Sequence, residues 1–168
     1  LEEASRVFGS QCIIASVDAR QVGVDGYQAF TDSGRQATGL DPADFVKSLA
    51  EAGAGEILLN SIDRDGRKAG YDLALIDRVA RVVDVPIIAC GGAGRPEHFL
   101  RVLEHPDVSA AAAANIFHFT EHSVALVKSA LSAWKLDVRM DSFADYTGFS
   151  LANDGRLLKQ PDSGLLDQ

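Results

Sequence analysis

The feature that most constrains the fold is a pattern that occurs three times: a short apolar run that ends abruptly in charged residues or glycine. The clearest copy lies within residues 53–66, and the other two lie within residues 12–18 and 86–94. Such runs are typical of buried parallel strands, which carry polar side chains and glycines to their carboxyl ends. The repetition predicts an α/β enzyme with a parallel sheet and a site at the carboxyl edge of that sheet.

Size and charge limit the class of protein. A chain of 168 residues fits one domain and can bury roughly 70% of its unfolded surface. A net charge of −8 and a pI near 4.9 argue against nucleic acid as a partner, because phosphates need a basic face. No apolar run approaches the ~20 residues of a membrane span, and the start lacks a leader-type segment. We therefore expect a cytoplasmic protein without a membrane partner. An anionic small substrate stays compatible with this charge, because backbone N–H groups can hold phosphate.

The two cysteines, Cys12 and Cys90, lie in apolar strand patterns without the spacing of a disulfide or metal site. We expect both to be buried as small hydrophobic side chains.

Four strand-then-helix units can be traced along the chain. Asp41 and Asp72 are expected helix N-caps, and Pro96 fits the first turn of a helix. Residues 108–114 are rich in alanine, which favours a helix, but their place after a short turn favours a buried strand. The expected strands are about 11–17, 56–61, 86–90 and 108–114, and the expected helices about 42–52, 73–83, 96–104 and 121–134.

Four such units do not close a (βα)8 barrel, which takes eight units and ~250 residues. We expect residues 1–134 to form a half-barrel of four βα units and residues 135–168 to be a C-terminal extension.

Five short motifs occur in an order and spacing that resemble a known family. They are Ala15-Ser16-Val17-Asp18-Ala19-Arg20, the run from Gly53 to Gly66, Gly70-Tyr71-Asp72, Gly91-Gly92-Ala93-Gly94 and Ile116-Phe117-His118-Phe119. Over about residues 10–139 the chain resembles the C-terminal half of the TIM (βα)8 barrel of the cyclase subunit of imidazole glycerol phosphate synthase.

The resemblance implies a lyase-type cyclisation in histidine biosynthesis, without a cofactor. Ammonia from a glutaminase partner would attack a bis-phosphate ribulosyl substrate, giving imidazole glycerol phosphate and an aminoimidazole carboxamide ribotide. It also implies a missing N-terminal half-barrel, in whose absence we expect self-association.

Asp18 is the candidate catalytic residue. It ends the first expected strand, and a carboxyl group there suits the proton transfers of ring closure; the alternative is a loop-capping aspartate. The resemblance implies the catalytic role. The family's second catalytic aspartate would lie on the first barrel strand, for which this chain has no counterpart, so we expect the chain alone to be catalytically incomplete.

The charged loop after the second strand carries Asp63, Asp65 and Gly66. The resemblance implies a role for Asp65 in the active site near a substrate phosphate, whereas Asp63 is as well explained by hydrogen bonds that hold the loop. The neighbouring basic residues suggest a phosphate clamp, although a solvated charge run is the commoner outcome; they are Arg64, Arg67 and Lys68.

A phosphate cradle is expected where the last two strands end. Gly91 and Gly92 permit close approach of backbone, and Ala114 and Asn115 open a short helical turn whose N–H groups can donate. The resemblance implies one of two phosphate sites here. The Gly91–Gly94 turn lacks the third glycine of a dinucleotide fingerprint, which argues against NAD.

Three further features of the sequence have a possible role in a site. The sequence from His118 to His122 spells the inverted zinc-protease motif, but Thr120 reads as a helix cap that would turn the two rings apart, so we expect no metal. Glu56 begins the second strand at the end opposite the site, where the resemblance implies a charged ammonia entrance. The polar loop 27–39 is expected to be a mobile lid.

Three positions depart from the family pattern. Asn60 and Cys90 stand where a threonine and a serine are usual, and Asn115 replaces a serine in the phosphate loop. With the extension after Arg139, these departures resemble paralogues from surface-polysaccharide biosynthesis that channel ammonia for sugar amidation. A third interpretation is a non-catalytic scaffold that binds a phosphorylated ligand.

Overall fold

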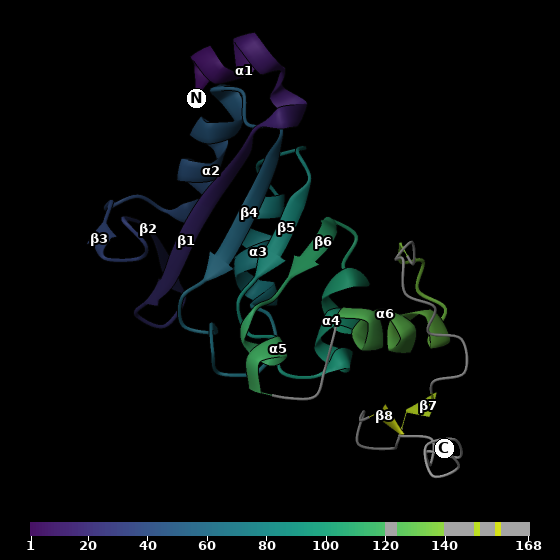
Figure 1. Cartoon of the computed structure of the whole chain (residues 1–168). Helices are drawn as coiled ribbons and strands as arrows, with labels where there is room; N and C mark the ends of the chain where they lie inside the picture. Colours follow the sequence, from purple (N-terminus) through teal and green to yellow (C-terminus); the bar gives the residue numbers. More distant parts are fainter. Residues whose placement is uncertain (120–123, 140–149, 152–156, 159–168) are drawn as a thin grey trace, which may run out of the picture.

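The computed structural model describes residues 1–119, 124–139, 150–151 and 157–158. Helices and strands alternate along most of this length (Figure 1). The helical elements are α1 (Glu2–Phe8), a 3-10 turn (Ser10–Cys12), α2 (Pro42–Glu51), α3 (Leu73–Ala80), α4 (Pro96–Leu103), α5 (Asn115–Phe119) and α6 (Val124–Ala133). The strands are β1 (Ile14–Val22), β2 (Gly26–Thr31), β3 (Gln36–Ala37), β4 (Glu56–Ser61), β5 (Ile87–Cys90), β6 (Val108–Ala112), β7 (Ser150–Leu151) and β8 (Leu157–Leu158).

The main sheet has the strand order β3-β2-β1-β4-β5-β6. Strands β1, β4, β5 and β6 are parallel, and each neighbouring pair is joined through a helix. This is the α/β arrangement of successive βα units that the sequence predicts, and it agrees with half of a βα barrel.

Alternate residues of each parallel strand face a layer of helices. Val17, Ile57, Leu59 and Ile87 are almost completely buried and form the centre of the core with side chains of α2, α3 and α4, which lie behind the sheet in Figure 1. The opposite sheet face holds the alternate set of side chains, among them Ile14, which is 55% exposed. The described part of the chain is therefore a two-layer structure with one covered sheet face.

Helix starts follow the capping residues that the sequence indicates. The Asp41 carboxylate accepts from the Ala43 N–H at 2.9 Å, with Pro42 as the first helical residue, and Asp72 caps α3 through the Leu75 N–H. Arg78 of α3 also pairs with Asp41, and its guanidinium holds the pKa of that carboxyl below its usual value. The two neighbouring helices are thereby joined at their solvent side.

The structure differs from the predicted elements over the first forty residues. The first strand is Ile14–Val22 rather than 11–17, because residues 10–12 form a 3-10 turn behind a helix that the sequence does not suggest. Cys12 is consequently exposed and not buried. The expected lid is not a plain loop: β2 pairs antiparallel with β1, and β3 with β2. We call the β1–β2 ribbon, residues 14–31, the hairpin.

The chain beyond β5 agrees with expectation where it is described. The alanine-rich segment is the strand β6, paired to β5, and α4 begins at Pro96. Of the expected extension, residues 135–139 follow α6, and β7 pairs antiparallel with β8. Most residues of the expected extension, 135–168, lie outside the described ranges.

Candidate active site at the carboxyl edge of the sheet

Three candidate residues lie side by side on the uncovered face of the sheet. Asp18 of β1 is opposite Asn60 of β4, and Asn60 is opposite Cys90 of β5. The Asn60 amide donates from Nδ2 to Asp18 Oδ1 at 2.8 Å. Directly opposed residues on adjacent strands share a face, so the row holds a carboxylate, an amide and a thiol near the carboxyl ends of the strands.

The Asn60 side chain is held through its Nδ2 atom. Its Oδ1 atom is buried and accepts no hydrogen bond from the described residues, and a Cβ on Gly91 would come within 2.9 Å of it. The amide orientation is therefore set by Asp18, which accepts from it as a carboxylate would. Asn60, which departs from the family pattern, here orients the candidate catalytic acid.

The Cys90 thiol is half-buried in this row. Burial raises its pKa most, and the charge of Asp65 raises it further. The Gly91 backbone lowers this pKa, and the charge of Asp18 adds a still smaller increase. The thiol is therefore protonated near neutral pH and is a poor nucleophile.

The loop after β4 brings Asp65 to the same edge. The Asp65 N–H donates to the Ser61 carbonyl at 3.0 Å, and the Ile62 N–H donates to the Ala19 carbonyl at 2.9 Å. Asp63 accepts from the Gln21 backbone N–H at 2.6 Å. Asp63 thus holds the loop against β1, as one of the two sequence interpretations has it, and the Asp65 side chain is left exposed.

The sequence explains Gly91 and Gly92 by a phosphate cradle, whereas the structure explains the absence of a side chain there by the contacts of the loop itself. Both have positive φ, +88° and +108°. A Cβ on Gly92 would lie 2.2 Å from the Gly70 carbonyl oxygen, and the Gly70 N–H donates to the Gly92 carbonyl at 2.8 Å. The space that a side chain would fill at Gly92 is occupied by the neighbouring loop, so close approach of backbone to backbone explains this glycine without a ligand.

Asn115 connects the last strand to the same loop. Its Nδ2 donates to the Gly66 carbonyl at 3.1 Å. Ala114 directly precedes α5 and is exposed. Gly66, Gly91, Gly92, Ala114 and Asn115, which the sequence assigns to phosphate binding, therefore belong to three loops that contact one another in a chain.

The comparisons with known proteins give the family of the chain. A family model described as "Histidine biosynthesis protein" matches residues 1–123. The chain belongs to this family. It is also 45% identical over 138 residues to the imidazole glycerol phosphate synthase subunit HisF of Hydrogenobaculum sp. (strain Y04AAS1), covering 82% of this chain and 55% of that protein.

Two further relatives carry the same printed name. The Bacillus cereus (strain Q1) protein is 44% identical over 140 residues, covering 83% of this chain and 56% of the relative. The Streptococcus mutans protein is 42% identical over 139 residues, covering 83% and 55%. The chain thus spans about half the length of the curated relatives it matches.

For this member of the histidine biosynthesis protein family, Glu56 lies apart from the other candidates. It opens β4, opposite Ile14, whereas Asn60 is near the carboxyl end of the same strand. Leu58 lies between them on the uncovered face, because successive side chains of a strand alternate. Glu56, Leu58 and Asn60 therefore follow one another along this face of β4.

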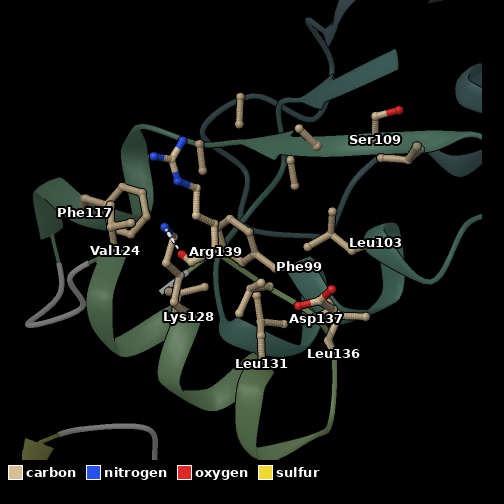
Figure 2. A pocket seen from close by; sticks show the side chains of 17 residues that line it. Phe99, Leu103, Ser109, Phe117, Val124, Lys128, Leu131, Leu136, Asp137 and Arg139 are labelled. Carbon is tan, nitrogen blue, oxygen red and sulfur yellow. Dashed lines mark hydrogen bonds between the residues drawn. The ribbon is translucent and has the colours of Figure 1, made fainter. Parts of the chain in front are cut away.

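An apolar cavity of about 570 Å³ lies away from these residues. It lies between β6, α4, α6 and residues 136–139, and Figure 2 shows Phe99, Leu103 and Leu131 pointing into it. None of the candidate site residues lines it. Its lining is packing surface beside β6, which has β5 as its one strand neighbour in the described sheet.

Two remaining absences concern the described residues only. They contain no cluster of three or more metal-binding side chains. The last three residues of the His118–His122 pattern, which is interpreted as not binding a metal, lie outside them. No described helix has both the length and the apolar character to cross a membrane.

Proposed function

We propose that this chain forms the C-terminal half of the cyclase subunit of an imidazole glycerol phosphate synthase. In this function it would use ammonia from a glutaminase subunit to close the imidazole ring of a bis-phosphate ribulosyl substrate, in the cytoplasm. The relatives that share 42–45% of aligned residues and carry this subunit's name support the proposal. Residues 1–134 would be the half-barrel and residues 135–168 an extension.

The observation that carries the proposal is the bond between Asn60 and Asp18 on the uncovered face. Ring closure needs a carboxyl group that exchanges protons with the substrate. Asp18 is partly accessible, accepts from the Asn60 amide, and lies in one row with Asn60 and Cys90 at the edge where Asp65 arrives. The contribution of a second aspartate from the rest of the barrel follows from the resemblance.

The remaining candidates divide between the two ends of the strands. Gly91, Gly92, Ala114 and Asn115 would hold a substrate phosphate, with Asp65 and Gly66 beside it. Glu56, at the amino edge, would form part of the ammonia entrance. This division suits a reaction in which a small nucleophile enters at one end of the sheet and reacts at the other.

A chimera tests the proposal. The aligned 138 residues of the Hydrogenobaculum subunit are replaced by those of this chain, and formation of imidazole glycerol phosphate is measured with ammonium as nitrogen donor. We expect turnover, and we expect Asp18→Asn to lower it by ~10²–10⁴-fold, because an amide keeps the shape but cannot exchange the proton.

The matched control is Asp84→Asn, an exposed residue before β5 at the opposite edge of the sheet. It should leave turnover unchanged. A chimera that folds, binds the substrate and gives no product would overturn the cyclase proposal in favour of ammonia channelling for sugar amidation or a binding scaffold. Full turnover by Asp18→Asn would remove Asp18 from the mechanism.

A further inference from the structure

The Asp72 carboxylate lies where three elements meet. It accepts from the Tyr27 hydroxyl of the hairpin at 3.0 Å, from the Ser61 hydroxyl at the end of β4 at 3.2 Å, and from the Leu75 N–H of α3 at 3.2 Å. Asp72 is 7% exposed and Ser61 is 2% exposed. Helix capping accounts for the Leu75 contact alone. The Tyr27 contact joins residues 45 positions apart in the sequence.

The loop between β4 and α3, residues 62–72, is attached to the hairpin at both ends. At its start, Asp63 accepts from the Gln21 backbone N–H, and at its end Asp72 accepts from Tyr27. Asp65 lies between these two attachments. The hairpin is therefore one of the elements that hold the loop carrying Asp65, beside the Gly70–Gly92 and Asn115–Gly66 hydrogen bonds.

The electrostatics favour a donor tyrosine and a charged acceptor. Burial raises the pKa of Tyr27 to about 12, with the hydrogen bond to Asp72 and the charge of Asp72 as further causes. Of the other charged groups near the phenol, Asp63 raises this pKa and Arg64 lowers it. Tyr27 keeps its proton at neutral pH, and a hydrogen bond to an ionised carboxylate is stronger than one between neutral groups.

We propose that Asp72 is a positioning residue that couples the hairpin to the loop carrying Asp65, so that hairpin and loop open and close as one unit. The two hydrogen bonds that make the coupling lie within this chain and need no other part of a barrel. Its importance for catalysis rests on the proposed function. The expected lid, residues 27–39, shares residues 27–31 with the hairpin, and on this view that part is attached to the loop that carries Asp65.

Tyr27→Phe is the variant that isolates the coupling. It removes one hydroxyl and leaves the Ser61 and Leu75 contacts of Asp72 in place, so α3 keeps its cap. The matched control is Tyr71→Phe, because the Tyr71 hydroxyl also makes one hydrogen bond, to the Ala112 carbonyl at 3.1 Å, but does not join the hairpin to the loop.

Hydrogen exchange of the full chain measures the result. In Tyr27→Phe we expect backbone exchange to accelerate at least about tenfold, the effect of losing one charge-assisted bond, in residues 26–31 and 62–70 together. Residues 87–90 should not change, and Tyr71→Phe should leave residues 26–31 unchanged, because the Tyr71 hydroxyl contacts β6 and not the hairpin. Acceleration of the hairpin alone, or of neither segment, would overturn the coupling.

Asp72→Asn gives a second readout that loss of packing alone would not produce. Asparagine keeps the shape and can still cap α3, but the charge beside Tyr27 is gone. The pKa of Tyr27, followed by NMR of labelled tyrosine, should fall from about 12 and stay above its ordinary value, since burial remains. The Tyr71 signal should not shift. An unchanged Tyr27 pKa in a folded variant would contradict the contact.

These two measurements require no turnover. If the chimera described above is inactive while Tyr27→Phe accelerates both segments, the proposed function fails and the coupling stands. If the chimera is active and the segments do not respond, the function stands and the coupling fails.

Discussion

Ala114 is the residue at which the phosphate proposal can be examined with least disturbance. It is exposed and directly precedes α5, whereas Asn115 contacts Gly66 and Gly92 is packed against Gly70. Aspartate and serine are both favoured directly before a helix, so either should be accepted by the fold. They differ in charge, which is the property that a phosphate senses.

We therefore expect Ala114→Asp to weaken binding of inorganic phosphate by at least about fivefold, because a like charge a few ångströms away costs ~1 kcal/mol or more. Ala114→Ser should bind like the unaltered chain. Isothermal titration with phosphate checks both. Equal affinities for the aspartate and serine variants would mean that phosphate is not held at Ala114.

The Asn60 contact shows what sequence reading of single residues can and cannot give. The sequence places Asp18 and Asn60 each at the end of an apolar run, so their arrival at one edge was predictable from the parallel topology. Their hydrogen bond was not, because it joins residues 42 positions apart and depends on strand register. Asn60 departs from the family pattern, which suggested altered substrate recognition. In the structure its side chain makes a hydrogen bond within the protein.

At the scale of elements, the loops after β4 and β5 interlock through glycine. A Cβ on Gly92 would meet the Gly70 backbone, and one on Gly94 would lie 2.3 Å from the Lys68 side chain. These contacts were hidden in the sequence, where a glycine-rich turn after a strand suggests room for a ligand. Replacing Gly92 consequently disturbs loop packing whether or not a phosphate binds there.

Gly92→Ala should lower the free energy of unfolding by ~3 kcal/mol or more, because a strained φ and a backbone clash both contribute. Gly23→Ala is the matched control: its φ of +68° is also left-handed, but nothing lies within 4 Å of an added Cβ. It should cost only ~1–2 kcal/mol. Urea unfolding measures both. Similar losses at the two positions would refute the interlocked arrangement.

The elements that the sequence predicted well are those with a local cause. Strands β4 and β5 are apolar runs bounded by glycine or proline, and α2 and α4 begin at a proline. The hairpin was missed because β2 mixes polar and apolar residues, Gly26-Tyr27-Gln28-Ala29-Phe30-Thr31, and is stabilised by pairing with β1. Helix α1 was missed because it buries none of its residues and so lacks an apolar stripe.

At the scale of the whole molecule, the part of the chain that the structure describes has an uncovered sheet face and a strand edge at β6. Ile14 is 55% exposed on that face, and the matched residues span only about half the length of the curated relatives. Exposed apolar surface and unpaired strand edges promote association. The net charge of −8 opposes it by repulsion between copies, and salt screens that repulsion.

The isolated chain should therefore form dimers or larger species at micromolar concentration in sedimentation velocity, and more of them as salt is raised, since screening removes the repulsion while leaving the apolar contact. Ile14→Asp should shift the distribution toward monomer by placing a charge on the uncovered face. Val24→Asp is the matched control, because Val24 is 85% exposed but lies in the turn between β1 and β2, and it should change little. A compact monomer in the unaltered chain at every salt concentration would show that the sheet face needs no partner. An equal shift by both variants would mean that added charge, and not the sheet face, controls association.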